Sequence, residues 1–203
     1  MIDLSLKILF FIGAYLLGSI PFGLFIGKLI GKVDVREHGS GNIGVSNVLR
    51  TVGLVPAIIV LVLDAGKGAL PVLLAKQMFP NETLWLLAGF MAIIGHNWPI
   101  FLNFKGGRGV ATTFGVLLSL IPMVAFWLII IWVITLAISR YISLSSITAA
   151  VAFPILLWIY DHPLSFFVLG LFISIFVIYR HRANIQRLIA GKEFKVGQKV
   201  NKN

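Results

Sequence analysis

Long apolar runs fill most of this chain, and the charged residues stand almost entirely between them. In order along the chain, the runs cover residues 8–27, 51–75, 84–102, 110–139, 141–160 and 163–179. Most are close to the roughly 20 residues that an α-helix needs to cross a bilayer. The pattern therefore predicts an all-α, polytopic integral membrane protein. The first run is too long for the core of a signal peptide, so we expect it to be a retained span.

The run at 110–139 is too long for one crossing, and we expect it to form two helices. At roughly 1.5 Å per residue it would extend ~45 Å, against ~30 Å of hydrocarbon. Pro122 lies inside this run, and helices tend to end just before a proline. The split predicts helices at 110–121 and 123–139, of which the first is short and half-buried in protein.

Basic residues then indicate which way the helices face. Seven transmembrane helices with the N-terminus outside place 14 of the 17 Lys and Arg residues on the inner side, as the positive-inside rule favours. These are Lys28, Lys32, Arg36, Arg50, Lys105, Arg108, Arg140 and the basic residues between positions 180 and 202. Only Lys7 and Lys76 fall outside, and Lys67 lies within a span. We predict a cytoplasmic C-terminus and one membrane domain over residues 1–203.

Composition narrows the chemistry. The chain is 59% hydrophobic with a mean hydropathy of +0.99, whereas a soluble domain averages about 45–50% apolar residues. It contains no cysteine, which excludes disulfides, thiolate nucleophiles and Cys-ligated metals. Its net charge of +10 lies beside apolar spans, so anionic headgroups or substrates fit better than nucleic acid.

The first basic cluster is a glycine-rich loop with the sequence His38-Gly39-Ser40-Gly41-Asn42-Ile43-Gly44, followed by Asn47 and Arg50. Bare backbone amides that open into a helix form an anion site, and Ser40, Asn42 and Arg50 add donors suited to phosphate. The G-x-G-x-x-G spacing does not indicate a dinucleotide fold, which needs a preceding strand. The alternative is an ordinary interhelical turn in which Ser or Asn caps the next helix.

The second cluster is the loop Lys105-Gly106-Gly107-Arg108-Gly109. Three glycines interleaved with two cations at the start of a helix predict an oxyanion nest, although the motif is not a Walker A loop. The alternative is a membrane-surface anchor with snorkelling Lys and Arg side chains. That alternative explains the charges but not the glycines.

An Asp, a Lys and a His interrupt the apolar spans. Asp64 and Lys67 stand three apart, so they share one helix face and can neutralise each other. Charges inside a membrane favour a functional role, but a structural ion pair is equally open. His96, near the cytoplasmic end of the run at 84–102, is more typical of a hydrogen-bonded structural residue than of a base. The sequence contains no cluster with metal-ligand spacing, so we expect no metal.

The third basic cluster leaves the last span and contains Arg180, His181, Arg182, Asn184 and Arg187. Beside these cations His181 should bind protons weakly and act as a neutral hydrogen-bond partner. The arginines alone would equally suit a helix that is attracted to anionic lipid. Ser143, which follows Arg140, could cap the next helix or touch a substrate.

Together these motifs closely resemble the acyl-phosphate-dependent glycerol-3-phosphate acyltransferase (PlsY) family of bacterial membranes. Three signatures carry the resemblance: the Gly-Ser-Gly-Asn loop with Asn47 and Arg50; residues 96–112 with Pro99 and the second loop; and Arg180-His181-Arg182 with Asn184, Ile185, Arg187, Leu188, Gly191 and Glu193. Residues 64–68 and the region of Ser143 also look like the family. Arg108 is a mild departure, because Lys is common there and the two cations differ in hydrogen-bond geometry.

The resemblance implies transfer of a fatty acyl group from acyl phosphate to the 1-hydroxyl of sn-glycerol 3-phosphate, the first acylation of phospholipid synthesis. The products would be 1-acylglycerol 3-phosphate (lysophosphatidic acid) and phosphate. The resemblance also implies a multi-pass protein of the bacterial inner membrane, with its active site on the cytoplasmic face among membrane lipid. We expect no cofactor, no metal and no nucleic acid, and a monomer.

The motifs and the resemblance together assign roles to individual residues. The expected catalytic residues are Ser40, Arg50, Lys105, Ser143, His181 and Asn184. The expected substrate-binding residues are Gly39, Gly41, Asn42, Asn47, Lys67, His96, Gly106, Gly107, Arg108 and Gly109. Asp64 and Glu193 are expected to be structural.

No Ser-His-Asp arrangement and no H-x-x-x-x-D pair is apparent in the sequence. An acyl donor should therefore be activated already, and its own phosphate could accept the hydroxyl proton while the protein positions the reactants and stabilises charge. The rival function is a membrane transporter or flippase for an anionic phosphorylated metabolite or lipid. It is disfavoured because the charges cluster on one face and no two matching halves with broken helices are seen. A lipid-binding anchor would leave the glycines unexplained.

Overall fold

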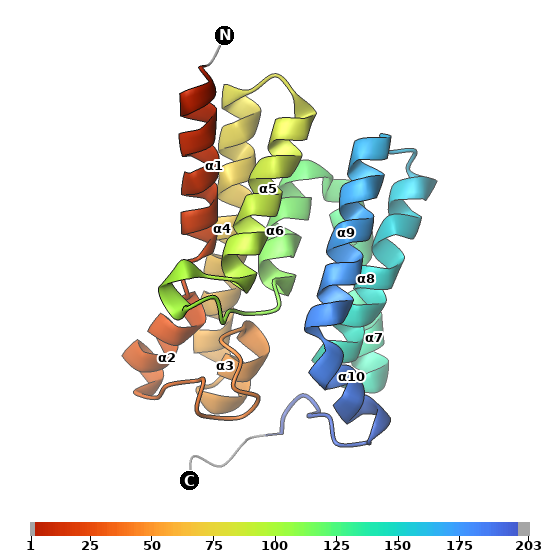
Figure 1. The fold of residues 1–203 in the computed structure, drawn as a ribbon. Coiled ribbons are helices and arrows are strands. Elements are labelled where there is room, and N and C mark those ends of the chain that lie inside the picture. Colours follow the sequence, from red (N-terminus) through yellow and green to blue (C-terminus); the bar gives the residue numbers. More distant parts are fainter. Residues whose placement is uncertain (1–2, 199–203) are drawn as a thin grey trace. The chain divides into compact units, whose positions relative to one another are not determined.

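The computed structural model describes residues 3–198, and over these residues it consists of helices without a strand (Figure 1). The elements are α1 (Leu4–Gly18), α2 (Phe22–Gly31), α3 (Val45–Thr51), α4 (Leu54–Met78), α5 (Glu82–Asn97), the 3-10 helix η1 (Ile100–Leu102), α6 (Val110–Leu120), α7 (Pro122–Ser139), α8 (Ile142–Ile159), α9 (Leu164–Arg180) and α10 (Arg182–Ile189). The all-α prediction is confirmed for this part of the chain. Lys199 and Lys202, which belong to the predicted basic tail, lie outside the described residues.

Five segments of the described chain are long and apolar enough to cross a membrane. They are Leu4–Gly31, Leu54–Met78, Glu82–Leu102, Pro122–Ser139 and Ile142–Ile159. The bent pair of α9 and α10, with 56° between its helices, would make a sixth. Many large apolar side chains on these segments are exposed, which suits contact with lipid rather than water. These spans agree with the predicted multi-pass membrane protein.

The predicted break at Pro122 is confirmed. Helix α6 ends at Leu120 and Pro122 is the first residue of α7, a position where the missing N–H and fixed φ of proline fit a helix start. The 11 residues of α6 span only about 16 Å, well short of a bilayer. Lys76 Nζ donates to the carbonyl of Ser119 at 2.6 Å. It thereby satisfies one of the carbonyls that the end of α6 leaves without an intrahelical donor.

Two other breaks were not predicted. The apolar run at 8–27 is one candidate span, but it consists of α1 and α2 with a break at Pro21. Proline cannot donate the i→i−4 hydrogen bond, and its ring clashes with the preceding turn. Similarly, the run at 84–102 leaves the helix at Asn97, two residues before Pro99. The short helix α3 was also missed.

Residues 3–120 form one compact unit. In it α4 packs against α5 and α6, and α1 packs against α5. Glycines permit the closest of these approaches, because a Cβ added at Gly115 would overlap the carbonyl oxygen of Ala65, and one at Gly68 would overlap that of Thr112. The backbones of α4 and α6 are therefore nearly in contact along one side.

Both glycine loops lie at the end of this unit that carries α2 and α3 (Figure 1). A buried apolar cluster organises that end, and it contains Leu24, Val35, Ile43, Val48, Ala57 and Val60. Leu102 from η1 packs against the same cluster. The apolar side chains thus bring the first loop and the approach to the second loop onto one small core.

Residues 121–198 form a second compact unit. Here α8 packs against both α7 and α9, and α10 contacts α8 and α9. Trp132 Nε1 in α7 donates to the hydroxyl of Ser146 in α8 at 3.2 Å. After α10 the chain returns towards the start of α8, where the amide of Val196 donates to the carbonyl of Arg140 at 2.8 Å.

Candidate active site

Asn47 holds the first glycine loop in shape from inside α3. Its side chain is fully buried; Nδ2 donates to the carbonyls of Val35 (2.7 Å) and His38 (3.1 Å), and Oδ1 accepts from the amide of Ser40 (2.9 Å). One side-chain amide therefore ties both ends of the loop together. These contacts describe a residue that positions the loop, and the expected contact between Asn47 and substrate stays a prediction.

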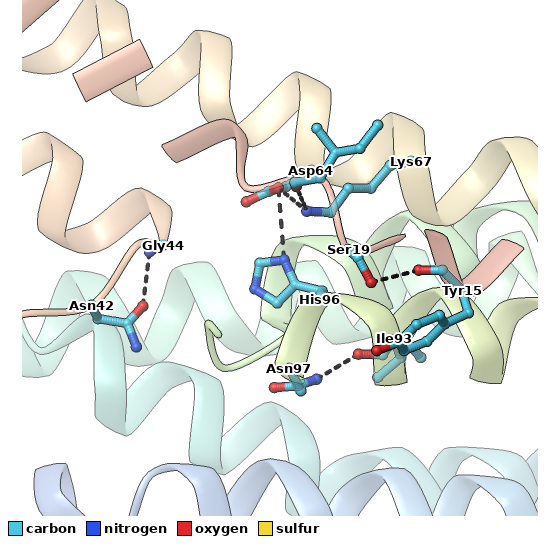
Figure 2. A network of polar contacts seen from close by, with 10 residues as sticks. Tyr15, Ser19, Asn42, Gly44, Asp64, Lys67, Ile93, His96 and Asn97 are labelled. Carbon is cyan, nitrogen blue, oxygen red and sulfur yellow. Dashed lines mark hydrogen bonds and ion pairs between the residues drawn. The ribbon is translucent and has the colours of Figure 1, made fainter. Parts of the chain in front are cut away.

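The first loop uses several of its own amides internally, which differs from the predicted row of bare N–H groups. The amides of Ser40, Gly41 and Gly44 all donate to acceptors within residues 38–47. Gly44, for example, donates to the side chain of Asn42 at 2.8 Å (Figure 2). The positive φ of Gly41, 66°, lets the backbone curl onto itself in this way. For these three amides the prediction was wrong.

Two side chains of this region are chemically suited to bind an anion. The Ser40 hydroxyl is buried and has no hydrogen-bond partner within residues 3–198. Arg50 lies half-buried on the last turn of α3. A buried hydroxyl and a guanidinium are both good donors to phosphate oxygens.

An ion pair lies just before the first loop and neutralises the cation Arg36. Arg36 donates to both carboxylate oxygens of Asp34, at 2.9 and 2.6 Å, and Lys28 Nζ lies 3.5 Å away. The hydrogen bonds from Arg36 hold the pKa of Asp34 well below its ordinary value. Arg36 is therefore neutralised by a neighbour and is a poor candidate for substrate binding.

The second loop folds back onto the end of α5. The amide of Gly106 donates to the carbonyl of Asn97 (3.2 Å), and that of Gly107 donates to the carbonyl of His96 (3.1 Å). The last carbonyls of a helix lack intrahelical donors, which explains this pairing. The prediction that both amides form an open oxyanion nest was therefore wrong. Lys105 is exposed and Arg108 half-buried, and an anion here would meet these cations and the opening turn of α6.

A buried ionic network of Asp64, Lys67 and His96 (Figure 2) adjoins the second loop, because a Cβ added at Gly107 would overlap the His96 ring. Lys67 Nζ lies 2.7 Å from Asp64 Oδ1 and also donates to the carbonyl of Ile20 at 2.7 Å. His96 Nδ1 lies 3.7 Å from the same Asp64 oxygen. The predicted pairing of Asp64 with Lys67 on one helix face is confirmed. The assignment of Lys67 and His96 to substrate binding stays a prediction, since both side chains are buried among protein groups.

In the second unit Glu193 is the centre of a buried hydrogen-bond network. Its Oε1 accepts from the Ser143 hydroxyl (3.0 Å) and from Asn184 Nδ2 (2.8 Å), and its Oε2 accepts from Arg187 Nε (2.7 Å). The carboxylate thus links the start of α8, the helix α10 and the tail. This geometry agrees with the expected structural role of Glu193.

His181 lies at the bend between α9 and α10 and is 2% exposed, so its contacts are set inside the protein. Its Nδ1 lies 2.8 Å from the carbonyl of Val177. If Nδ1 carries the proton of a neutral imidazole, Nε2 is left as the acceptor. The described contacts therefore fit the predicted role of a neutral hydrogen-bond partner.

Three buried polar side chains near the second loop received no role from the sequence. Asn97 Nδ2 donates to the carbonyl of Ile93 at 2.8 Å, while its Oδ1 lacks a partner in the described chain (Figure 2). The hydroxyls of Thr112 and Thr113 are likewise buried without a hydrogen-bond partner among residues 3–198. The signal in the sequence is that polar residues flank the loop on both sides within otherwise apolar spans. Over the same residues, no group of three or more His, Cys, Asp and Glu side chains could hold a metal ion.

Comparison with curated proteins gives a family for this fold and these motifs. The family model described as glycerol-3-phosphate acyltransferase matches residues 8–191, a stretch that contains both glycine loops, His181 and Asn184. A relative named glycerol-3-phosphate acyltransferase, from Halalkalibacterium halodurans, is 45% identical over 195 residues. That alignment covers 93% of this chain and 94% of the relative.

Solved structures agree with the sequence comparison. One match is the crystal structure of PlsY (YgiH), an integral membrane glycerol 3-phosphate acyltransferase, in its glycerol 3-phosphate form. It superposes on this chain with a TM-score of 0.90 and is 40% identical in sequence. The superposition covers 94% of this chain and 96% of that one. The lysophosphatidic acid form of PlsY gives a TM-score of 0.87 at 39% identity, with 95% and 96% covered. The resemblance stated from the motifs is thereby confirmed, and this chain belongs to the glycerol-3-phosphate acyltransferase family.

Proposed function

We propose that this chain acylates the 1-hydroxyl of sn-glycerol 3-phosphate, with acyl phosphate as the donor, in the first acylation of bacterial phospholipid synthesis. The products are 1-acylglycerol 3-phosphate, or lysophosphatidic acid, and inorganic phosphate. The observation that carries the proposal is the family match over residues 8–191, together with the structural likeness to PlsY in both its glycerol 3-phosphate and its lysophosphatidic acid forms. The two PlsY structures contain glycerol 3-phosphate and lysophosphatidic acid in their names, and the choice of acyl phosphate as donor is our inference.

The proposed chemistry needs no base from the protein. The glycerol hydroxyl oxygen attacks the carbonyl carbon of the acyl phosphate, an ester bond forms, and the bond between that carbon and the phosphate oxygen breaks. The hydroxyl proton passes to the leaving phosphate. The protein then has to bring two anions together and stabilise the charge that develops between them, which is a matter of positioning and of preorganised donors.

Ser40 and Arg50 would serve the reaction from the first loop. Support comes from the buried Ser40 hydroxyl without a described partner, and from the half-buried position of Arg50 at the end of α3. Gly39, Gly41 and Asn42 would shape the substrate site. Such a pair of donors suits phosphate oxygens, which accept strong, charge-assisted hydrogen bonds.

Lys105 would be the catalytic cation of the second loop, and Arg108 would bind substrate beside it. The exposure of Lys105 supports this assignment, since a cation that meets a soluble anion has to be reachable from water. The glycines at 106, 107 and 109 would let the backbone approach the ligand closely.

Ser143, His181 and Asn184 complete the proposed catalytic set. Glu193 supports the proposal because it holds the side chains of Ser143 and Asn184 at hydrogen-bond distance. His181 and Asn184 stand at the bend and in the first turn of α10, beside the cations that an anionic substrate would meet.

For the topology, we propose seven crossings in the inner membrane with the N-terminus outside and the reaction on the cytoplasmic face. The short helix α6 would provide the additional crossing only together with its flanking residues, since its 11 residues do not span the bilayer by themselves. The distribution of basic residues supports this orientation, because it places both glycine loops and the basic residues from position 180 onwards on the inner side. A single domain over 1–203 and a monomeric state belong to the same proposal.

The function is tested with purified protein in detergent, labelled glycerol 3-phosphate, and either acyl phosphate, acyl-CoA or acylated carrier protein. The expected result is labelled lysophosphatidic acid with acyl phosphate alone, together with one phosphate per acyl group transferred. Product formation with only a thioester donor would contradict the proposed donor. The absence of product with every donor would contradict the function itself and return attention to transport, which needs a sealed compartment.

A matched pair of variants distinguishes a specific role of Arg50 from a general effect of positive charge near the first loop. Arg50→Ala should lower kcat/KM by about 100-fold, the cost typical of losing one stabilising donor. Arg36→Ala removes the same charge from the same region, but from a residue already paired with Asp34, and should retain most activity. Equal losses in both variants would argue that Arg50 contributes only to the overall positive field.

A further inference from the structure

The buried ionic network around Asp64 is larger than the helix pair that the sequence predicts. Asp64, Lys67 and His96 are 2%, 3% and 4% exposed, so all three ionisable groups are buried from bulk solvent. Lys67 contacts Asp64 and the carbonyl of Ile20, and His96 faces the same carboxylate (Figure 2). The network joins α4, the end of α5 and the break between α1 and α2. Burying such groups is costly, so an arrangement that retains them is expected to set geometry or function.

The second glycine loop packs against one side of this network, at His96. A Cβ added at Gly107 would overlap Nε2 of His96, so the loop backbone rests directly against the imidazole ring. The amides of Gly106 and Gly107 are bonded to the carbonyls of Asn97 and His96 themselves. The ring and the backbone of His96 therefore both contact the loop, one by packing and the other by a hydrogen bond.

The position of the ring is in turn set by the charges beneath it. His96 Nδ1 points at Asp64 from 3.7 Å (Figure 2), and Asp64 is held in place by the ammonium group of Lys67 at 2.7 Å. Lys67 is anchored on its far side by Ile20, next to Pro21. A chain of contacts thus runs from a helix break, through an ion pair, to the underside of the loop that carries Lys105.

We propose that Asp64, Lys67 and His96 are positioning residues that fix the shape of the second loop for glycerol 3-phosphate, and that none of them touches substrate. This inference rests on the acyltransferase function proposed above and replaces the expectation that Lys67 and His96 bind substrate directly. The buried ammonium group of Lys67 contacts Asp64 and the carbonyl of Ile20 and lies 5.4 Å from the centre of the Phe22 ring. The His96 ring is covered by Gly107. The network acts on the reaction only through the loop.

The first test compares Asp64→Asn and His96→Asn with the control Gly66→Ala. Gly66 lies in the same helix, and a Cβ added there meets no atom within 4 Å. Each network variant should raise the KM for glycerol 3-phosphate by ~10-fold or more, because small displacements of binding groups have large effects. The KM for acyl phosphate should change less than about twofold. A purely structural defect would instead reduce the active fraction and leave both KM values unchanged.

A second readout follows the loop without using activity. Hydrogen exchange of the loop at 104–109 should become about tenfold faster in both network variants, since the bonds of Gly106 and Gly107 open more often. Exchange in α1 and in the first loop should stay at the level of the control. Uniformly faster exchange throughout the first unit would overturn the proposal, and so would an unchanged loop.

A double-mutant cycle tests the contact between the loop and the ring even if the Asp64 variant does not accumulate in membranes. Gly107→Ala should raise the KM for glycerol 3-phosphate in the native background, because the added methyl group displaces the loop from the ring. In a His96→Ala background the same substitution should add less than about twofold, because the overlapping atom is gone. Fully additive effects would contradict direct contact between ring and loop. If the native protein forms no lysophosphatidic acid, the function fails, while the exchange measurement still decides the positioning proposal.

Discussion

Two buried side chains, one in each unit, hold the candidate catalytic residues in place. Asn47 makes three hydrogen bonds to the backbone of the first loop, and Glu193 accepts three from Ser143, Asn184 and Arg187. Neither side chain needs to touch a substrate to matter. Removing a partner from a buried polar group leaves the other partner unsatisfied, at a cost of about 1–3 kcal/mol per group.

Even a conservative replacement of Asn47 should strongly lower the activity of the enzyme. Asn47→Asp keeps the shape and the acceptor oxygen, but it cannot donate to the carbonyls of Val35 and His38 and places a negative charge against them. We expect both Asn47→Asp and Asn47→Ala to lose more than about 90% of kcat/KM, in line with the loss of several buried bonds. Near-normal turnover in the Asp variant would show that only the bond to Ser40 is required.

Replacements of Glu193 should lower activity and stability in steps that follow how much of its hydrogen-bond network each one removes. Glu193→Gln retains an oxygen that can accept from Asn184 but turns an amide donor towards Arg187, so part of the network survives. We expect kcat to fall in the order native, Gln, Ala, and the unfolding temperature in detergent to fall in the same order. An Ala variant as active as native protein would contradict a supporting role for this carboxylate.

At the scale of helices, close packing on α4 fixes the position of α6, the helix that directly follows the second loop. The contact between Gly115 and the carbonyl of Ala65 leaves no room for a methyl group. Because α6 is too short to span the bilayer by itself, its position depends on this contact and on the bond from Lys76 to Ser119. The helix is thus held at both its middle and its end.

Gly115→Ala should separate these two helices. We expect it to destabilise the first unit by about 1–3 kcal/mol, the usual cost of overpacking, seen as a lower unfolding temperature in detergent. Gly66→Ala, in α4 but facing open space, should leave that temperature unchanged. The idea fails if the two glycine variants unfold at the same temperature.

Local rules predicted some of these elements and missed others. Pro122 divided the long run as expected, and the i, i+3 spacing of Asp64 and Lys67 gave their ion pair. The same proline rule, applied to Pro21, would have predicted the break between α1 and α2. It was missed because the run at 8–27 was taken as uniformly apolar.

The internal use of the loop amides could not be predicted in this way. Gly106 and Gly107 donate to carbonyls of α5, and Ser40 donates to the side chain of Asn47. These partners lie several residues away, and only the folded path of the chain brings them within reach. Composition and glycine spacing therefore located both loops, but they did not show which N–H groups each loop leaves for a ligand.

At the scale of the whole molecule, the proposed reaction requires two anionic reactants to meet cations on one side of the membrane. The first loop, the second loop and α10 carry those cations, and the distribution of Lys and Arg along the chain supports a common cytoplasmic face. The native chain has no cysteine, so any single introduced cysteine reports its own side without a background signal.

The most direct test of that requirement is labelling of single cysteines by a membrane-impermeant maleimide in intact cells and in opened membranes. His38→Cys, Asn103→Cys and Lys192→Cys report the three basic regions, and Glu82→Cys reports the turn before α5. We predict that the first three react only after the membrane is opened and that Glu82→Cys reacts in intact cells. Labelling of any one of the first three from outside would separate the motifs across the bilayer and contradict the account.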